Sequence, residues 1–190
     1  RDRLRSRGLG DVYKRQVMST KNSNFFSRDC MVQALIQLLK TKSLSNITIT
    51  ELTERAGVSR MTYYRNYHSL DEIFSSYLKD LVESYRQDVA TWPDKGNYND
   101  SRNMLHCYEY FNHYKEFIAC LVQTGLGHLL LQALDSYILD TYYTEDKGQD
   151  FYYTLRAFSG SLYNIYVTWI LEDSKESAEE IVSIICKIYS

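Results

Sequence analysis

The segment from Thr48 to Phe74, TITELTERAGVSRMTYYRNYHSLDEIF, carries signals for helix starts at close spacing. Thr48 is followed three residues later by Glu51, and Ser69 is followed three residues later by Glu72. Each pair matches a capping box, in which a hydroxyl and a carboxylate satisfy backbone N–H groups that the first helical turn leaves unpaired. Helices are therefore expected directly after Thr48 and after Ser69, and only short helices fit between these points.

Two short helices fit in this space. The first is expected from Ile49 to Ala56, ended by Gly57, because glycine tolerates the left-handed backbone of a tight C-terminal turn. The second is expected from Arg60 to Asn66, with Ser59 as its N-cap. This layout is that of a helix-turn-helix, whose second helix enters the DNA major groove. All-α proteins that do not bind DNA contain the same layout.

The composition of the second short helix favours DNA binding. No acidic residue lies between Ser59 and Leu70. Phosphate and base-edge contacts are made mainly by Arg, Ser, Thr, Asn and Tyr side chains. The expected helix supplies four of these types, at Arg60, Thr62, Tyr64, Arg65 and Asn66.

Residues 47–74 resemble the DNA-binding domain of the tetracycline-repressor (TetR) family of bacterial regulators, and the resemblance covers roughly residues 24–81. The positions that carry it are Thr48, Ala56-Gly57-Val58-Ser59, Thr62, Tyr63-Tyr64-Arg65, Tyr67, Ser69, and Asp71 before Ile73. The resemblance implies phosphate contacts from Thr48, Ser59, Tyr64 and Asn66. It implies base-edge contacts from Arg60, Met61 and Thr62.

The segment departs from the family at two positions. Family members usually have Lys at the position of Leu70, where the Lys binds a phosphate, and Leu cannot make that contact. His68 or Arg65 could replace it, so both are candidate DNA-binding residues. The small Ala of the family is Thr53 here, and its hydroxyl is expected to bond back to its own helix.

Length and composition bound the whole chain. Its 190 residues suit one or two compact domains, proline occurs once, and no period-2 strand pattern persists. We therefore expect an all-α fold of about nine helices. A three-helix helix-turn-helix domain is expected at residues 18–80, followed at residues 81–190 by a helical bundle for dimerisation and effector binding.

A cytoplasmic protein is expected. No apolar run in the sequence is long enough to span a membrane, and no secretory signal appears. The four cysteines have no paired spacing and are expected to be reduced thiols, at Cys30, Cys107, Cys120 and Cys186.

Charge is distributed unevenly along the chain. Residues 21–68 carry seven Lys and Arg against three Asp and Glu, whereas residues 69–190 carry nine against nineteen. A basic head on an acidic body favours approach to a polyanion by one end only. The alternative is an uneven surface charge without functional consequence.

Residues 1–17 are expected to be a non-native or disordered leader. The segment RDRLRSRGLGDVYKRQ is basic, lacks helical periodicity, and resembles translated vector sequence. The alternative is a basic arm that contacts the DNA backbone.

Apolar periodicity predicts the remaining helices. An N-terminal helix at Ser27–Lys42 is expected to have its apolar stripe at Met31, Ala34, Leu35, Leu38 and Leu39. The helices expected after the helix-turn-helix are Ser69–Thr91, Asp100–Asn112, Tyr114–Thr124, Gly127–Tyr143, Asp150–Leu171 and Ala178–Tyr189.

The last two helices are candidates for a dimer interface. Both are apolar over a broader face than one buried stripe requires, and the segment AFSGSLYNIYVTWILEDSKESAEEI resembles the C-terminal helices of TetR regulators of Firmicutes. The alternative is a core within one chain. The predicted interface residues are Leu155, Phe158, Leu162, Ile165, Trp169, Ile181, Ile184, Ile185 and Ile188.

No motif for catalysis or for a cofactor is present. His106 and His113 share a helix face, but a metal site requires closer ligands and further donors. The eighteen tyrosines could line an effector pocket or simply form an aromatic core, because tyrosine combines an apolar ring with a polar tip.

The function we expect is therefore a DNA-binding transcriptional repressor, not an enzyme. It would bind a near-palindromic, double-stranded DNA operator as a homodimer, with release by a small-molecule effector if one exists. The alternative is a TetR-like coactivator or interaction protein that acts through a protein partner.

Overall fold

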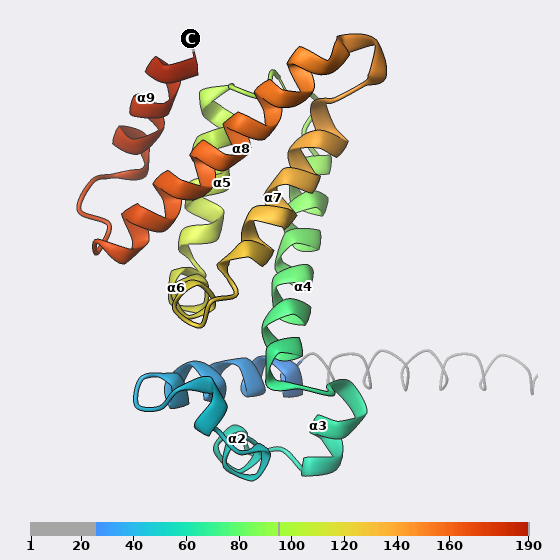
Figure 1. Ribbon diagram of the computed structural model, residues 1–190, viewed down its shortest axis with the longest axis vertical. Helices are drawn as coiled ribbons and strands as arrows, with labels where there is room; N and C mark the ends of the chain where they lie inside the picture. Colours follow the sequence, from blue (N-terminus) through green and yellow to red (C-terminus); the bar gives the residue numbers. More distant parts are fainter. Residues whose placement is uncertain (1–25, 95, 190) are drawn as a thin grey trace, which may run out of the picture. The chain divides into compact units, whose positions relative to one another are not determined.

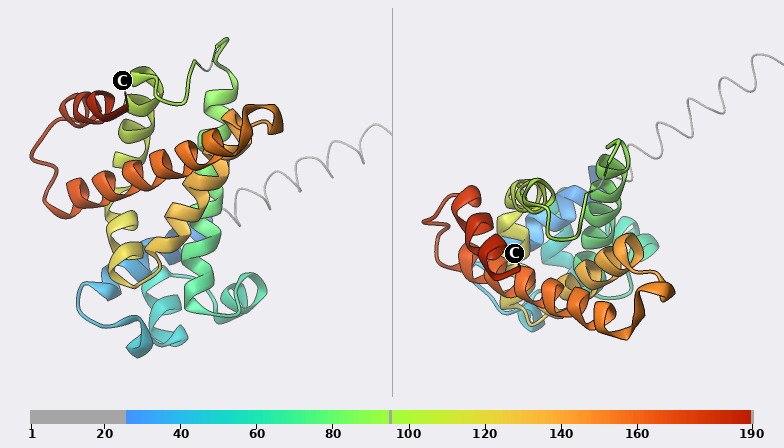
Figure 2. Two further views of the ribbon diagram at one scale, coloured as in Figure 1. Left: turned by 45° about the horizontal axis from the view of Figure 1, so that its top comes forward. Right: turned by 90° about the horizontal axis from the view of Figure 1, so that it is seen from above.

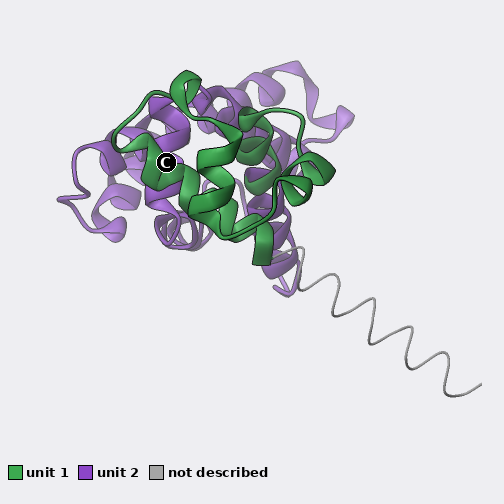
Figure 3. Cartoon of the chain, turned by 90° about the horizontal axis from the view of Figure 1, so that it is seen from below, with its two compact units in different colours: residues 1–77 green, residues 78–190 purple. Residues whose placement is uncertain are grey.

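The computed structural model describes residues 26–94 and 96–189, and all regular elements in these ranges are helices (Figure 1). The expected all-α fold is confirmed, while the expected leader at residues 1–17 lies outside the described residues. Two compact units meet between Tyr77 and Leu78, inside helix α4 (Figure 3).

The first unit consists of short helices. It contains a helix at residues 26–39, followed by η1 (Leu44–Asn46), α2 (Ile49–Ala56), α3 (Arg60–Asn66) and the start of α4 (Leu70–Ala90). The predicted bounds of α2 and α3 are confirmed to the residue. This agreement follows from the strength of their capping signals.

The N-terminal helix is shorter and more deeply buried than predicted. It ends at residue 39, because the N–H groups of Thr41 and Lys42 both donate to the carbonyl of Leu38, each at 3.1 Å. Its buried face includes Val32 and Ile36 in addition to the predicted stripe, of which Leu39 is only half-buried.

The second unit consists of longer helices. After the rest of α4, it contains α5 (Ser101–Asn112), α6 (Lys115–Gln123), α7 (Gly127–Tyr142), η2 (Glu145–Lys147), α8 (Gly148–Leu171) and α9 (Ala178–Tyr189). Helix α8 packs along α7, and α9 lies against α5 (Figure 2). The predicted helices are confirmed to within two residues, except that η2 has no periodic signal and was not predicted.

A polar contact lies inside the second unit. The hydroxyl of Ser159, on α8, is fully buried and donates to the carboxylate of Asp135 on α7. The guanidinium of Arg156 lies 3.3 Å from the same carboxylate. The buried hydroxyl and the carboxylate are therefore both satisfied where α7 and α8 pack.

Among the described residues, one bent pair of helices has the length and composition of a membrane span. No single helix there has the length and apolar content to cross a membrane, and α6 with α7 meets those criteria only as a pair bent by 119°.

Candidate functional site

Side-chain caps fix the starts of α2 and α3. Thr48 Oγ1 accepts the backbone N–H of Glu51 at 3.2 Å, and Ser59 Oγ accepts that of Thr62 at 3.1 Å. The hydroxyls of Ser59 and Thr62 also share one hydrogen bond of 2.9 Å. Whichever of the two donates in that bond, the hydroxyl hydrogen of the other still points elsewhere and can donate to a phosphate.

The turn between α2 and α3 depends on Gly57. Its φ of 66° is left-handed, and its N–H donates to the carbonyl of Glu54, while the next N–H, of Val58, donates to that of Thr53. This pair of bonds is the Schellman arrangement that ends a helix sharply. The expectation for Thr53 is also confirmed: the side chain is buried and its hydroxyl donates back to the carbonyls of Ile49 and Thr50.

Buried tyrosines hold α3 in place. Tyr63 is 1% exposed and Tyr67 is 2% exposed, and their ring centroids lie 5.9 Å apart. Nε of Arg28, on the N-terminal helix, donates to the Tyr67 hydroxyl at 3.3 Å, and its Nη2 donates to the Ser76 hydroxyl on α4. Tyr63 is the buried residue of α3, and the opposite face of the helix is exposed to solvent.

The predicted DNA-binding residues lie on α3 and beside it: Thr48 is the N-cap of α2, Ser59 is the N-cap of α3, and His68 follows α3. Tyr64 and Met61 are 57% and 76% exposed. Of the nine predicted residues, seven are exposed and Thr62 and Asn66 are half-buried. The exposed seven are Thr48, Ser59, Arg60, Met61, Tyr64, Arg65 and His68. The amide nitrogen of Asn66 donates to the carbonyl of Thr62 at 2.7 Å, so a phosphate would have to use its second N–H.

Two acidic side chains near α3, Glu51 and Glu72, have local hydrogen-bond partners. On α2, Glu51 forms an ion pair with Lys42 at 2.6 Å, and this hydrogen bond lowers the pKa of Glu51. At the start of α4, the Glu72 carboxylate accepts the backbone N–H of His68, while Ser69 Oγ accepts the N–H of Glu72. These acidic groups are engaged locally, which reduces their repulsion of an approaching polyanion.

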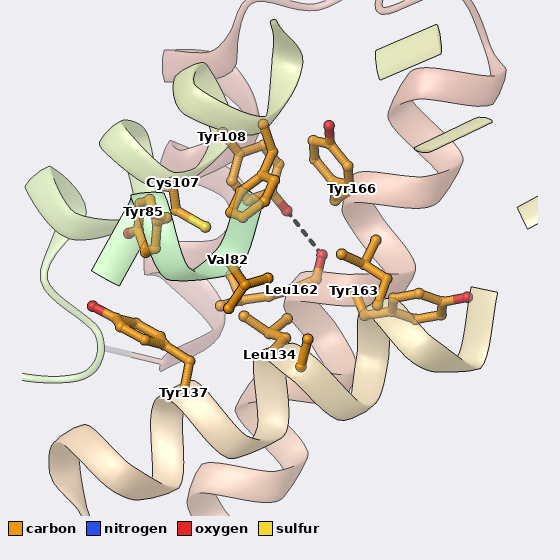
Figure 4. A pocket seen from close by; sticks show the side chains of 12 residues that line it. Val82, Tyr85, Cys107, Tyr108, Leu134, Tyr137, Leu162, Tyr163 and Tyr166 are labelled. Atoms are coloured by element: carbon orange, nitrogen blue, oxygen red, sulfur yellow. Dashed lines mark hydrogen bonds between the residues drawn. The ribbon is translucent and has the colours of Figure 1, made fainter. Parts of the chain in front are cut away.

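The second unit contains a cavity of about 50 Å³. Side chains from four helices line it (Figure 4). They are Val82 and Tyr85 of α4, Cys107, Tyr108 and Phe111 of α5, Leu130, Ala133, Leu134 and Tyr137 of α7, and Leu162, Tyr163 and Tyr166 of α8.

The lining of this cavity is neutral at physiological pH. It includes no Asp, Glu, Lys or Arg, and burial raises the pKa of the Cys107 thiol to about 12. The Tyr108 hydroxyl donates to the carbonyl of Leu162 at 3.2 Å (Figure 4). The Tyr166 hydroxyl is buried and has no hydrogen-bond partner within the described part of the chain. The cavity therefore suits an apolar, uncharged molecule with at most one hydrogen-bonding group.

The sequence indicates that tyrosines could line an effector pocket but does not show which of them do so. Membership of the cavity depends on how side chains from α4, α5, α7 and α8 meet, and periodicity shows only that each lies on an inward face.

Helices α7 and α8 approach each other closely at Gly127 of α7 and Tyr163 of α8. A Cβ atom added to Gly127 would lie 2.6 Å from the Tyr163 hydroxyl, so a larger residue there would displace the Tyr163 side chain.

Most of the predicted interface residues lie inside the protomer. Leu155, Phe158, Leu162, Trp169, Ile181 and Ile185 are at most 7% exposed in the single chain. A second chain cannot contact side chains buried to this extent, so these six belong to the protomer core. Ile165 is half-buried, and Ile184 and Ile188 are 48% and 60% exposed. Only these three of the nine remain accessible to a partner.

The two histidines considered as metal ligands have other partners. His106 Nε2 lies 2.6 Å from Asp88 Oδ2, and its ring stacks on Tyr85. His113 Nδ1 lies 2.7 Å from the carbonyl of Glu109. Among residues 26–94 and 96–189, no three His, Cys, Asp or Glu side chains are grouped to hold a metal ion.

Comparison with known proteins gives a distant sequence relative. No family model matches the chain. The uncharacterized HTH-type transcriptional regulator YxbF of Bacillus subtilis (strain 168) is 26% identical over 157 residues. The match covers 78% of this chain but 41% of YxbF, so the chain spans about two fifths of the length of that relative.

Solved structures share the fold over most of the chain. The fatty acid degradation regulator FadR from Bacillus halodurans matches with a TM-score of 0.58 at 14% identity, over 84% of this chain and 96% of FadR. A TetR transcriptional regulator from Rhodococcus sp. RHA1 matches with a TM-score of 0.53 at 16% identity, over 87% and 96%. The chain has the TetR fold. Helices α2 and α3 form the helix-turn-helix of this fold. The resemblance at residues 47–74 implied the same assignment.

Proposed function

We propose that this TetR-fold protein is a transcriptional regulator that binds an operator through α3. The observation that carries the proposal is the exposed face of α3: Arg60, Tyr64 and Arg65 are exposed, while Tyr63 of the same helix and Tyr67 directly after it are buried. A short, rigid helix with cationic and hydroxyl groups on its free face fits the major groove.

The charge distribution supports the same direction of approach. The first unit is basic over residues 21–68, and the acidic excess lies in residues 69–190. Phosphates attract the first region and repel the second, so association is steered toward the end of the chain that carries α3.

The regulator acts as a homodimer on a near-palindromic operator, as a repressor. The exposed Ile184 and Ile188 of α9 are one helical turn apart, and the half-buried Ile165 of α8 adds to the apolar surface. Two-fold pairing through this surface presents two copies of α3 to two inverted half-sites, at one DNA turn or a multiple of it.

The direct test is selection of bound duplexes from a random DNA pool. The expected result is enrichment of one inverted repeat with half-sites spaced by about 10 base pairs or a multiple. Sedimentation should show a dimer for the wild type and a monomer for the double variant Ile184→Asp and Ile188→Asp. Tyr153→Asp, at another exposed apolar position, is the matched control. Failure to enrich any sequence would contradict the proposal.

The cavity of the second unit is the proposed effector site. Its neutral, apolar walls select a small, uncharged, apolar molecule. At about 50 Å³ the cavity holds only a few heavy atoms, so a larger effector requires the side chains around it to move. An effector that binds one conformation of the body better than another changes operator affinity by that difference.

Xenon, a single uncharged and apolar atom that enters dry apolar cavities, is a suitable neutral probe. We expect it to raise the Tm of the wild type and to weaken operator binding, because a ligand that binds only the native state stabilises it. Ala133→Leu fills the cavity and should abolish both effects, while Ala90→Leu, at an exposed position of α4, should keep them. An unchanged response in Ala133→Leu would contradict an effector site at this cavity.

Leu70 favours one alternative function. It occupies the position of the family's phosphate-binding Lys and is half-buried at the first turn of α4. A chain that has lost this contact could act through a protein partner instead of DNA. This second candidate is supported if the chain shows no selective DNA binding and forms a stoichiometric complex with another regulator.

A further inference from the structure

Met61 is the most exposed large apolar side chain in the described part of the chain, at 76%. Seven such side chains are exposed there, and two of them, Met61 and Tyr64, lie on the seven-residue α3. This concentration on the shortest α-helix is not explained by packing, because the opposite face of α3 is closely packed around Tyr63.

Met61 and Tyr64 lie three residues apart and therefore share a face of α3. Arg60 and Arg65 are exposed on either side of this pair. The face thus combines cationic donors at its edges with an apolar centre. The only apolar group that base pairs present in the major groove is the C5 methyl of thymine.

We propose that Met61 selects thymine in each half-site by contact with its C5 methyl group. The side chain is unbranched and flexible, so it can follow the position of a methyl group that a rigid side chain would miss. Arg60, one residue closer to the helix N-terminus, is placed to donate to guanine O6 and N7 nearby. This inference rests on the proposed function and specifies one base that α3 recognises in each half-site.

The experiment replaces each thymine of the selected operator, one at a time, by deoxyuridine, which lacks only the methyl group. In the wild type, one replacement per half-site should weaken binding about fourfold, since burial of one methyl contributes about 0.8 kcal/mol. In Met61→Ala, the same replacement should have no effect, so the two changes are coupled. Tyr153→Ala, a matched loss of an exposed apolar side chain, should keep the wild-type sensitivity.

The outcomes separate this inference from the proposed function. If no duplex is selected, both fail. If an operator is selected and bound but no thymine replacement matters, only the role of Met61 fails. If the replacement matters equally in Met61→Ala but not in Tyr64→Ala, the methyl group is read by Tyr64 and the assignment to Met61 is overturned. Circular dichroism of both variants verifies that α3 remains folded.

Discussion

The unit that ends at Tyr77 and the unit that begins at Leu78 are stabilised in different ways. In the first, α2 and α3 have eight and seven residues, and each begins at a hydroxyl cap. In the second, α8 has 24 residues and no side-chain cap, and it is held by buried aromatic and aliphatic side chains. Helices as short as α2 and α3 are not stable alone, so the first unit depends on a few polar bonds and a small core.

The two units also differ in what they expose. The first unit exposes a polar, cationic face on α3, so it does not bury all sides of its helices. In the interior of the second unit, aromatic rings such as Tyr85, Tyr108 and Phe158 are buried. Loss of one buried ring should therefore lower the stability of the first unit more than that of the second. Substitution of exposed residues should change function more than stability.

The largest effect is expected from Tyr63→Ala. Loss of this buried ring should cost about 3–5 kcal/mol, enough to unfold the first unit while the second remains folded. Chemical denaturation followed by far-UV circular dichroism should then show one transition and a reduced helical signal at zero denaturant. Tyr64→Ala, one position along but 57% exposed, should leave stability nearly unchanged. Equal losses of stability in Tyr63→Ala and Tyr64→Ala would contradict a special role for the buried ring in the first unit.

Alkaline pH should weaken mainly the second unit. Burial raises the pKa of Cys107 from 9.0 to about 12, so its stabilising contribution is fully present below pH 9 and is lost as pH rises toward 12. The free energy of unfolding should fall by an amount on the order of 3 kcal/mol over this range. Burial also raises the pKa of Tyr142 to about 12, which acts in the same direction.

Urea titrations at pH 8, 9, 10 and 11 measure this loss. The free energy of unfolding of Cys107→Ala should depend less on pH than that of the wild type, because this variant has no thiol at position 107 to ionise. Cys30→Ala, a half-buried thiol of the first unit, is the control. If wild type and Cys107→Ala show the same pH dependence, the buried thiol does not contribute.

A smaller effect is expected from removal of the caps. Ser59→Ala should destabilise the first unit by about 1 kcal/mol, because the N–H of Thr62 loses its acceptor. Thr48→Ala should cost a similar amount at α2. Ser183→Ala, an exposed serine inside α9, should not destabilise the protein. Thermal denaturation of the three variants distinguishes a capping role from a general loss of hydroxyls.

The smallest effect on the folded protomer is expected from Ile188→Ser. The side chain is 60% exposed, so the unfolding free energy of the monomer should change by less than about 0.5 kcal/mol. Dimerisation, measured by sedimentation, should weaken markedly. A large loss of monomer stability would mean that Ile188 belongs to the protomer core.

The sequence predicts an element well where its ends carry chemical signals. Helix α9 begins as predicted because Ser177 Oγ accepts the N–H of Glu180 and the Glu180 carboxylate accepts the N–H of Ser177. Helix α8 lacks such a cap, and its predicted start was two residues late. Local hydrogen bonds are specified by neighbouring residues, whereas the start of an uncapped helix depends on what it packs against.

The exposed residues of α3 were predictable for a related reason. Most of them are polar, and polar side chains are expected to face solvent, whereas the exposure of the apolar Met61 does not follow from its residue type. The predicted interface was less accurate, because apolar periodicity does not distinguish burial in the same chain from burial against a second chain. Leu155 and Ile185 have the same pattern as Ile188, yet they are fully buried in the protomer.

The most direct test of the account measures how strongly α3 discriminates between sequences. At one fixed salt concentration, the affinity for the selected operator is divided by the affinity for a scrambled duplex. The wild type and Lys175→Ala, which removes an exposed charge between α8 and α9, should give ratios of about 10³ or more. The double variant Arg60→Ala and Tyr64→Ala should reduce the ratio nearly to one. A double variant that keeps the wild-type ratio would contradict the central claim.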